Sequence, residues 1–485
     1  MTIKKLCLLL IVGLTFTNCF KDRDDDAVTA SEINDFVWKA MNAAYLYKAE
    51  IPDLANNRFS SNDEYADYLN QYSAPEDLFE TLIYERETVD RFSFIIPNYI
   101  AFLQSQEGVS LSNGLEFDFY FKPGSATEVF GIIRLVLNGS SGDMLGLQRG
   151  QIFDAVDGVP LTENNLASLL NQTSYTLNFA IYNDNGTPEV TDDTIESTTN
   201  TTNISKVVYT ENPVHTTEII DVDGENVGYL LYNGFSNGDN NQFLNSLNNA
   251  FGQFQANNVQ HLVIDLRYNP GGIISTAALL GSMVTGQFNG EVFSKLVYNE
   301  DLQSSNTNVE FVNSFNGNSI NSLNLNKVYV LTTDASASAS ELIINSLGAY
   351  IDVVQIGDTT VGKTQASVTL FDSPDLGPND INPSHTYALQ PLVANSINVN
   401  DQEVPSSGIV PDITVLESPR NYGILGDENE PLLAAAILDI QGSGRYSQPF
   451  SDVRPVKKEI NISETEQRMY IDSELTNFER IDFKQ

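Results

Sequence analysis

Residues 327–341 have the sequence KVYVLTTDASASASE, and this segment joins a strand pattern to a helix pattern. The β-branched and apolar residues up to Thr333 predict a buried strand. From Ser340 to Tyr350 the apolar residues recur at helical spacing. Ser338 therefore lies at or just before a helix N-terminus, where unpaired N–H groups and the helix dipole favour negative charge. Its hydroxyl is either a helix cap or a nucleophile whose attack creates an oxyanion.

A second predicted strand ends in a pair of glycines. Residues 263–272 have the sequence VIDLRYNPGG, and the apolar run Ile273–Val284 that follows predicts a helix. Gly271 and Gly272 carry no side chain, so their backbone N–H groups can approach a substrate closely. The glycine pair is therefore a second candidate for contact with a reacting group.

Strands and helices alternate over residues 212–450. The predicted strands are Val227–Tyr232, Leu262–Leu266, Lys327–Leu331 and Val353–Ile356, and the predicted helices are Asn240–Gln255, Ile273–Val284 and Ser340–Tyr350. This order predicts an α/β domain with a largely parallel sheet. Sites in such sheets lie at the carboxyl ends of the strands, where both segments described above are expected.

Four motifs in this region resemble those of the C-terminal processing, or tail-specific, serine protease family. They are Asp265-Leu-Arg-Tyr-Asn-Pro-Gly-Gly272, Ser336-Ala-Ser-Ala-Ser-Glu341, Gly362-Lys363 and Gly408-Ile-Val-Pro-Asp412. The resemblance implies a crotonase-like (ClpP-like) α/β protease core over residues 212–450. The whole chain is then a multidomain α+β protein.

The same resemblance implies a role for each motif residue. Ser338 would be the nucleophile, and Lys363 would be the general base. The N–H groups of Ala339 and of Gly271 or Gly272 would form the oxyanion hole. The family has a glutamine four residues after the lysine, where this chain has Ser367, and the nearest glutamine is Gln365. Which of these two side chains would orient the lysine amine is left open.

Composition independently favours lysine as the base. The chain has three histidines, His215, His261 and His385, and none lies in a segment with the features of a site. A lysine base must be neutral near pH 7, so its pKa must fall by about three units from about 10.4, which burial can achieve. No Gly-x-Ser-x-Gly motif surrounds Ser338, and no serine precedes a lysine by three residues, so these signatures of other serine enzymes do not apply to this segment.

The N-terminus predicts export and a lipid anchor. Residues 1–18 form a short basic and apolar stretch typical of a lipoprotein signal peptide, which would leave Cys19 as the lipidated first residue. An ordinary signal peptide that contains a cysteine is the alternative. The acidic tether 19–28 resembles the surface-export signals of Bacteroidetes lipoproteins. We therefore expect the protein in the cell envelope, lipid-anchored to the outer membrane on its periplasmic or surface side.

Charge and motif content exclude several classes of partner. The net charge of −39 becomes −41 when Lys4 and Lys5 leave with the signal peptide, and such a chain repels nucleic acid. The sequence has no metal-binding spacing and no nucleotide-binding glycine motif, so no cofactor is expected. Cys7 is the only other cysteine, which leaves the mature chain without a possible internal disulfide.

Four further regions surround the predicted core. Thr29 and Glu32 form a capping-box pattern that begins a small helical N-terminal domain over residues 29–105. Residues 106–185 contain four strand patterns and the segment 146–158, which resembles the signature of PDZ domains. Such a region either binds peptides as an added strand or is an ordinary β module that gates the site. The Thr- and Asn-rich stretch 186–211 predicts a linker or long surface loop, and residues 451–485 a C-terminal extension.

The function predicted from these observations is a serine endopeptidase of the C-terminal processing type. It would use a Ser/Lys dyad to hydrolyse peptide bonds of cell-envelope or extracellular proteins, and the PDZ resemblance implies that it would hold them by their C-termini. Two alternatives use the same residues. One is a catalytically inactive, peptide-binding envelope lipoprotein, and the other is an acyl-transfer enzyme that acts on a non-peptide substrate.

Overall fold

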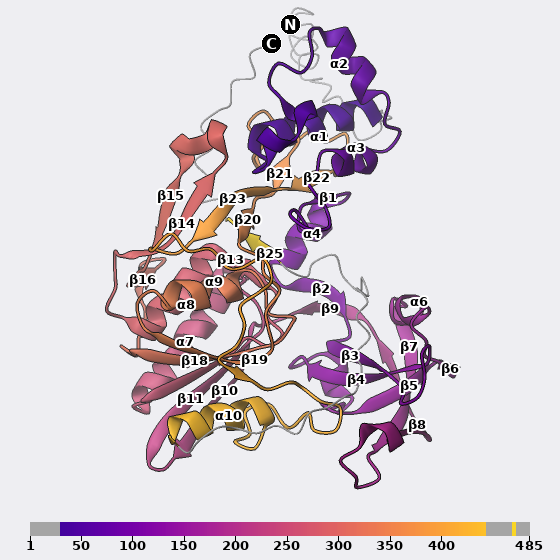
Figure 1. Cartoon of the computed structure of the whole chain (residues 1–485), viewed down its shortest axis with the longest axis vertical. Coiled ribbons are helices and arrows are strands. Elements are labelled where there is room, and N and C mark those ends of the chain that lie inside the picture. Colours follow the sequence, from indigo (N-terminus) through magenta and orange to yellow (C-terminus); the bar gives the residue numbers. More distant parts are fainter. Residues whose placement is uncertain (1–29, 443–467, 472–485) are drawn as a thin grey trace, which may run out of the picture.

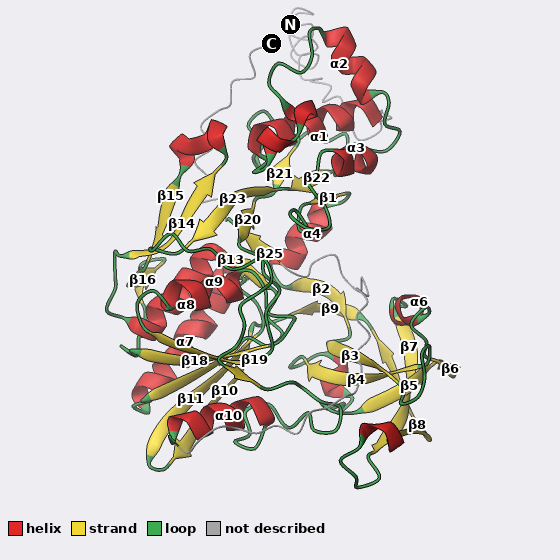
Figure 2. Cartoon of the chain, viewed as in Figure 1, coloured by secondary structure: helices red, strands yellow, loops and turns green. Residues whose placement is uncertain are grey.

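The computed structural model describes residues 30–442 and 468–471. Figure 1 shows a helical part at one end, a central α/β part and a separate β part at the side of the centre. Figure 2 shows that helices dominate the first part and strands the last. The predicted signal peptide, Cys19, Thr29 and most of the C-terminal extension lie outside the described residues.

The helical N-terminal part packs its apolar face inward, as the helical spacing predicts. Its elements are α1 (Ala30–Ala44), η2 (Lys48–Glu50), η3 (Pro52–Leu54), α2 (Asn62–Leu69), α3 (Pro75–Thr81), β1 (Phe94–Ile96) and α4 (Tyr99–Gln106). The apolar stripe of α1 is buried, with Val37, Ala40 and Met41 fully so. β1 pairs with β22 (Ala388–Gln390), so this part is tied to the core by a strand ladder.

The β part, called the β domain below, is an antiparallel sheet. Its strand order is β3 (Leu115–Phe121), β4 (Val129–Val136), β5 (Ile152–Val156), β7 (Ser174–Asn183) and β8 (Thr194–Ser205), and β6 (Val159–Pro160) pairs with β5. Helices α5 (Ser141–Met144) and α6 (Leu166–Leu170) lie between strands. Phe153 and Leu166 belong to its own apolar cluster. The four strand patterns of the sequence are therefore confirmed to within a few residues.

The prediction of a linker over residues 186–211 is wrong. This stretch contains η4 (Val190–Asp192), β8, which pairs along β7, and β9 (Val207–Thr210), which pairs with β2 (Val109–Ser112). Most side chains of β8 are exposed because it is the edge strand of the sheet. An edge strand with two solvated faces needs no apolar alternation, and its many threonines are β-branched residues that favour strands. The polar composition of residues 186–211 therefore led to the prediction of a linker where the structure has strands.

The central sheet is largely parallel, as the alternation of elements predicts. Its order is β10 (Val214–Val222), β11 (Glu225–Tyr232), β12 (His261–Asp265), β18 (Lys327–Thr332), β19 (Asp352–Gly357) and β24 (Ile413–Thr414), and only β10 runs antiparallel. Figure 1 shows α7 (Gln242–Ala256), α8 (Ile274–Thr285) and α9 (Ala339–Leu347) on one face of this sheet and α10 (Pro431–Ile440) on the other. Alternate residues of each strand accordingly enter different apolar clusters.

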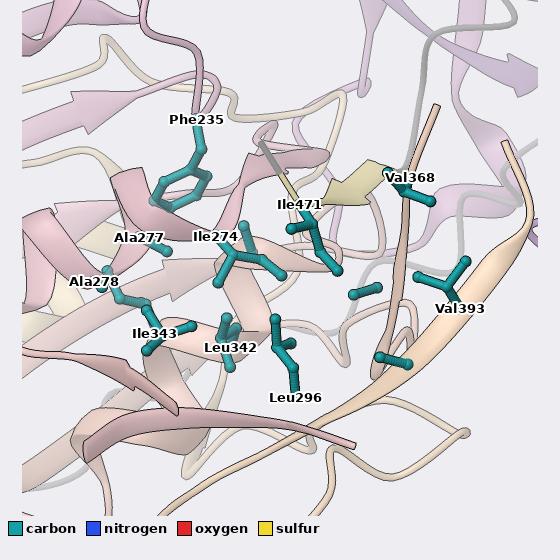
Figure 3. Close-up of a cluster of buried hydrophobic side chains, with 14 of the residues drawn as sticks. Phe235, Ile274, Ala277, Ala278, Leu296, Leu342, Ile343, Val368, Val393 and Ile471 are labelled. Atoms are coloured by element: carbon teal, nitrogen blue, oxygen red, sulfur yellow. The ribbon is translucent and has the colours of Figure 1, made fainter. Parts of the chain in front are cut away.

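A second sheet stands over the carboxyl ends of these strands. Its order is β13 (Gly271–Ile273), β25 (Arg468–Tyr470), β20 (Gln365–Ser367), β23 (Leu392–Ile397), β14 (Val292–Tyr298) and β15 (Thr307–Glu310). The remaining short elements are β16 (Ser314–Phe315), β17 (Asn318–Ser319), β21 (Leu370–Phe371), η5 (Asp239–Asn241) and η6 (Glu300–Ser305). Figure 3 shows where the helices meet this sheet, with Ile274, Leu342 and Leu296 in one buried apolar cluster. A strand from the predicted C-terminal extension is thus part of the core.

Candidate active site

Ser338 occupies a strained turn between β18 and α9. Its backbone has φ 66° and ψ −114°, a region that residues with a side chain rarely adopt. The residue is 0% exposed, and its Oγ has no hydrogen-bond partner in the part of the chain that the structure describes. Ser338 and Glu341 have the arrangement of a capping box, in which the Glu341 carboxylate accepts from Ser338 N, but Ser338 Oγ itself makes no side-chain cap hydrogen bond. Strain and an unsatisfied buried hydroxyl together mark the position as a functional candidate.

The serine turn is fixed against the turn that precedes the glycine pair. Ser336 Oγ donates to Leu266 O at 2.8 Å, and Ala337 N donates to Asn269 O at 3.2 Å. Ser340 Oγ also donates to Asn269 O, at 2.9 Å. The two segments that sequence analysis selected are therefore bonded directly to each other.

The buried carboxylate of Glu341 joins the serine turn to the lysine segment. Its Oε2 accepts hydrogen bonds from Ser338 N at 2.7 Å and from Lys363 N at 2.9 Å. Its Oε1 accepts from Gly362 N at 2.6 Å and from Thr360 Oγ1 at 2.5 Å. Burial raises the pKa of the Glu341 carboxyl, and these four hydrogen bonds oppose the rise. One side chain thus brings the backbones of Ser338 and Lys363 to the same oxygen atom.

Lys363 is 1% exposed and is flanked by the helical N-terminal part. Its Nζ lies 5.2 Å from the ring centroid of Phe92. The neighbouring Arg91 donates from Nη2 to the carbonyl oxygens of Val361, Gly362 and Ser406, at 3.3, 3.2 and 3.1 Å. The lysine segment is therefore held from the core by Glu341 and from the other side by the Arg91–Phe92 pair.

The glycine pair requires glycine at both positions. Gly271 has φ 108° and Gly272 has φ 137°, and a Cβ added to Gly272 would lie 2.3 Å from Phe235 O. Gly271 N already donates to Asn269 Oδ1 at 2.9 Å. Of the two predicted oxyanion-hole glycines, Gly271 therefore already has an acceptor for its amide, and Gly272 pairs with Met469 of β25.

Models of one known protein family match this chain. A model of peptidase family S41 matches residues 226–415, and a model of the peptidase S41 N-terminal domain matches residues 32–94. The chain belongs to peptidase family S41. The first match contains the serine turn, the glycine pair and the lysine segment of this S41 protein, and the second contains Arg91 and Phe92.

Sequence relatives and a solved structure extend the comparison. A carboxyl-terminal-processing protease from Picosynechococcus sp. is 26% identical over 240 residues, which are 50% of this chain and 51% of that protein. Carboxyl-terminal-processing peptidase 3 of Arabidopsis thaliana is 24% identical over 188 residues, or 38% of this chain and 31% of that protein. This S41 chain thus spans about half the length, or less, of these relatives. A structure assigned to the S41 proteases, from Bacteroides fragilis, superposes with a TM-score of 0.68 at 27% identity and covers 84% of this chain and 97% of that one.

A buried ion network lies beneath the glycine turn of the S41 core. Arg267 is fully buried and pairs with Asp265 at 2.8 Å, Glu430 at 2.7 Å and Glu417 at 3.0 Å. Arg149 of the β domain also pairs with Glu417 and donates from Nη1 to Tyr268 Oη at 2.5 Å. Burial alone would raise the pKa of Glu417, but the two arginines lower it to about 2.

Both residues that could orient the lysine amine, Gln365 and Ser367, make contacts with other side chains. Burial raises the pKa of Tyr47 to about 12, and Gln365 beside its hydroxyl opposes this rise. Ser367 is buried, and its Oγ accepts from Gln390 Nε2 at 3.0 Å. The structure therefore links Gln365 to the helical N-terminal part, and it places a buried glutamine, Gln390, against the serine that stands where the family has glutamine.

A pocket of about 500 Å³ connects the glycine turn to the β domain. Its walls include Gly271 and Gly272 on one side and Gly114 and Glu116 on the other. Glu211 also lines it, and burial raises the pKa of that carboxyl to about 7. The volume of the pocket lies within the range typical of ligand-binding pockets in proteins.

Sequence reasoning missed three contributors to the site. The sequence did hold a signal for the role of Glu341. This residue lies in a predicted helix near two reactive segments, and a carboxylate that is buried there needs hydrogen-bond donors. The sequence held no such signal for Arg91 and Phe92, since their contacts join distant parts of the chain.

Among the described residues no helix is long and apolar enough to span a membrane, and no group of three His, Cys, Asp or Glu residues could hold a metal ion.

Proposed function

We propose that this protein is a serine endopeptidase that uses Ser338 and Lys363 as a catalytic dyad. The observation that carries the proposal is the unpartnered, buried Oγ of Ser338, in a strained turn that shares the carboxylate of Glu341 with the lysine segment. Burial of the lysine at 1% exposure also supports the proposal, because a low-dielectric site favours the neutral amine that a general base requires.

The reaction follows the chemistry of acyl transfer. Ser338 Oγ attacks the scissile carbonyl carbon while the neutral amine of Lys363 accepts the hydroxyl proton. The N–H groups of Gly272 and Ala339 stabilise the oxyanion, and cleavage of the C–N bond transfers the proton to the leaving amine. Water then attacks the acyl-enzyme with Lys363 again as the base, which releases the new carboxyl end and restores Ser338.

The surroundings of the site support protein or peptide substrates. In this proposal the β domain is a PDZ-like module that binds an extended segment, including a substrate's C-terminus, beside Gly114, and the pocket leads from there to Gly272. In this proposal the protease core has a crotonase-like fold. A lipid on Cys19 holds the enzyme at the outer membrane of the cell envelope, where exported proteins are its substrates. The net charge of −39 disfavours nucleic acid as a partner.

Proteolysis of a denatured, unstructured protein tests the proposal. A soluble form that lacks residues 1–26 is compared with Ser338→Ala and Lys363→Ala, and the cut sites are identified by mass spectrometry. Lys327→Ala and Ser373→Ala are matched controls in the same domain, because their side chains bond exposed carboxylates away from the site. Cleavage that both site variants lose, and both controls keep, supports the dyad. Cleavage that survives Ser338→Ala contradicts it.

An inactive peptide-binding lipoprotein is the second candidate function. The observation that favours it is Ser367 in place of the glutamine that orients the lysine amine in the family, together with the contact between Gln365 and Tyr47. Binding of a labelled unstructured peptide by the parent protein, without cleavage and without acylation of Ser338 by a serine-directed fluorophosphonate, would favour this candidate over the peptidase.

A further inference from the structure

The chain's own C-terminal region supplies a strand beside the candidate active site. In β25, Arg468, Met469 and Tyr470 pair in parallel with Gly271, Gly272 and Ile273. On its other edge Tyr470 pairs with Ser367 of β20, and Ile471 N donates to Ser367 O at 3.0 Å. The segment 468–471 thus fills the groove between the glycine pair and the strand that follows Lys363.

The two side chains described for this segment enter separate apolar sites. Ile471 is 4% exposed, and Figure 3 shows it between Ile274 and Val368 in the buried cluster. Tyr470 is 9% exposed and lines the pocket that leads to the β domain. The groove therefore has one site that accepts an aliphatic side chain and, one residue earlier in the occupying strand, one that accepts an aromatic side chain.

An extended peptide substrate of the proposed peptidase would need the same groove. Its scissile carbonyl must lie beside the Gly272 amide and within reach of Ser338, and backbone pairing with β13 is the way in which a strand edge holds an extended peptide. The pairing partner of Gly272 in the structure is Met469. A substrate strand and β25 therefore compete for one position.

We propose that residues 468–471 are a ligand in cis that occupies the substrate-strand groove and inhibits the full chain. The proposal rests on the proposed peptidase function, and it also names the substrate class, which is an extended peptide with an aromatic residue followed by an aliphatic one. The tail is held by three residue pairs on one edge and a single pair on the other, so a substrate can displace it. A permanent structural strand is the alternative.

Mass action sets the size of the expected inhibition. A tethered segment has an effective concentration of about 1 mM, so a tail whose intrinsic Kd is about 0.1 mM lowers the apparent affinity for substrate about tenfold. The loss appears in KM, because the tail and the substrate exclude each other, and kcat at saturating substrate stays the same.

The test uses the full chain with Ile471→Asp, which places a carboxylate in the apolar site and expels the tail. Ile424→Asp is the matched control, because Ile424 is 73% exposed. We expect the tail variant to cleave an unstructured protein with a KM about tenfold lower than that of the parent and the control. An unchanged KM, or a fall in both kcat and melting temperature, would show a structural strand and overturn the proposal.

A second measurement does not depend on cleavage. A labelled peptide of residues 464–475 should bind Ser338→Ala/Ile471→Asp at least tenfold more tightly than Ser338→Ala alone, and a scrambled peptide should bind neither. Equal binding to both proteins overturns the cis ligand. The parent and Ile471→Asp could both fail to cleave while this difference in binding persists. That result would support the groove and its cis ligand and would contradict the proposed peptidase function.

Discussion

Two domains contact the core next to the candidate site, and they do so by different physics. The helical N-terminal part contacts the lysine segment through Arg91, which binds neutral carbonyl groups, and through the ring of Phe92. The β domain contacts the glycine turn through Arg149, which shares the buried carboxylate of Glu417 with Arg267. The first junction lies at the surface, and the second is a desolvated cluster of charges.

Because of this difference, the two junctions should respond to different changes in conditions. A desolvated ion pair depends on the ionisation of both partners and is costly to leave half made. An exposed arginine on carbonyl groups is worth little and keeps its charge at every accessible pH. We therefore expect the glycine side of the site to be sensitive to acid and to substitution, and the lysine side to be tolerant of both.

The largest expected effect is on the β-domain junction. Glu417→Ala leaves Arg267 and Arg149 short of a buried anion, which should lower the free energy of unfolding by about 3–5 kcal/mol. Denaturant unfolding near pH 7 measures this loss. Asp401→Ala is the matched control, because its pair with Lys295 is exposed and should contribute less than about 1 kcal/mol. Equal losses in both variants would show that the two kinds of contact do not differ.

Acid should weaken the same junction. Because the folded pKa of Glu417 lies at about 2, below its ordinary 4.5, the carboxylate stabilises the fold above pH 4.5, and this contribution disappears as the pH falls toward 2. The loss amounts to about 3 kcal/mol. Melting temperatures measured from pH 5 to pH 2 should fall less steeply in Glu417→Gln than in the parent. Parallel curves would mean that another carboxyl sets the acid response.

The serine and lysine segments should depend on Glu341 more than on either neighbouring domain. Glu341→Gln keeps the shape but turns one acceptor oxygen into a donor, which faces N–H groups that already donate. We expect a loss of about 2 kcal/mol in stability and a fall in kcat of at least tenfold with little change in KM. Kinetics on a peptide substrate measure the split. A change in KM alone would show that Glu341 shapes the groove and does not align Ser338 with Lys363.

Local patterns predicted much of this structure and of its site. The strand before Ser338, the helix after it and the glycine turn each follow from spacing within about ten residues, and the parallel sheet follows from their order. Strand β8 was missed because an exposed edge strand lacks the apolar alternation on which the prediction depends.

Features fixed by distant contacts could not be predicted from the sequence. Segment 468–471 forms a strand only because β13 and β20 offer free edges on both sides. Phe92 meets Lys363 through the packing of two domains, and Glu417 has its low pKa only after Arg149 arrives from the β domain. Each of these contacts depends on tertiary structure, which residue spacing does not encode.

The smallest expected effect is at the lysine junction and separates packing from electrostatics there. The face of Phe92 stabilises an ammonium group 5.2 Å away by about 0.5–1 kcal/mol, so Phe92→Leu should make the protonated form of Lys363, the proposed base, less favourable. The acid limb of the kcat/KM profile should then move to lower pH by about half a unit, with unchanged melting temperature. Phe92→Tyr keeps an aromatic face and should leave the limb in place. If Phe92→Leu and Phe92→Tyr shift the pH profile of kcat/KM equally, the ring acts by packing alone. The two domain junctions would then differ only in strength.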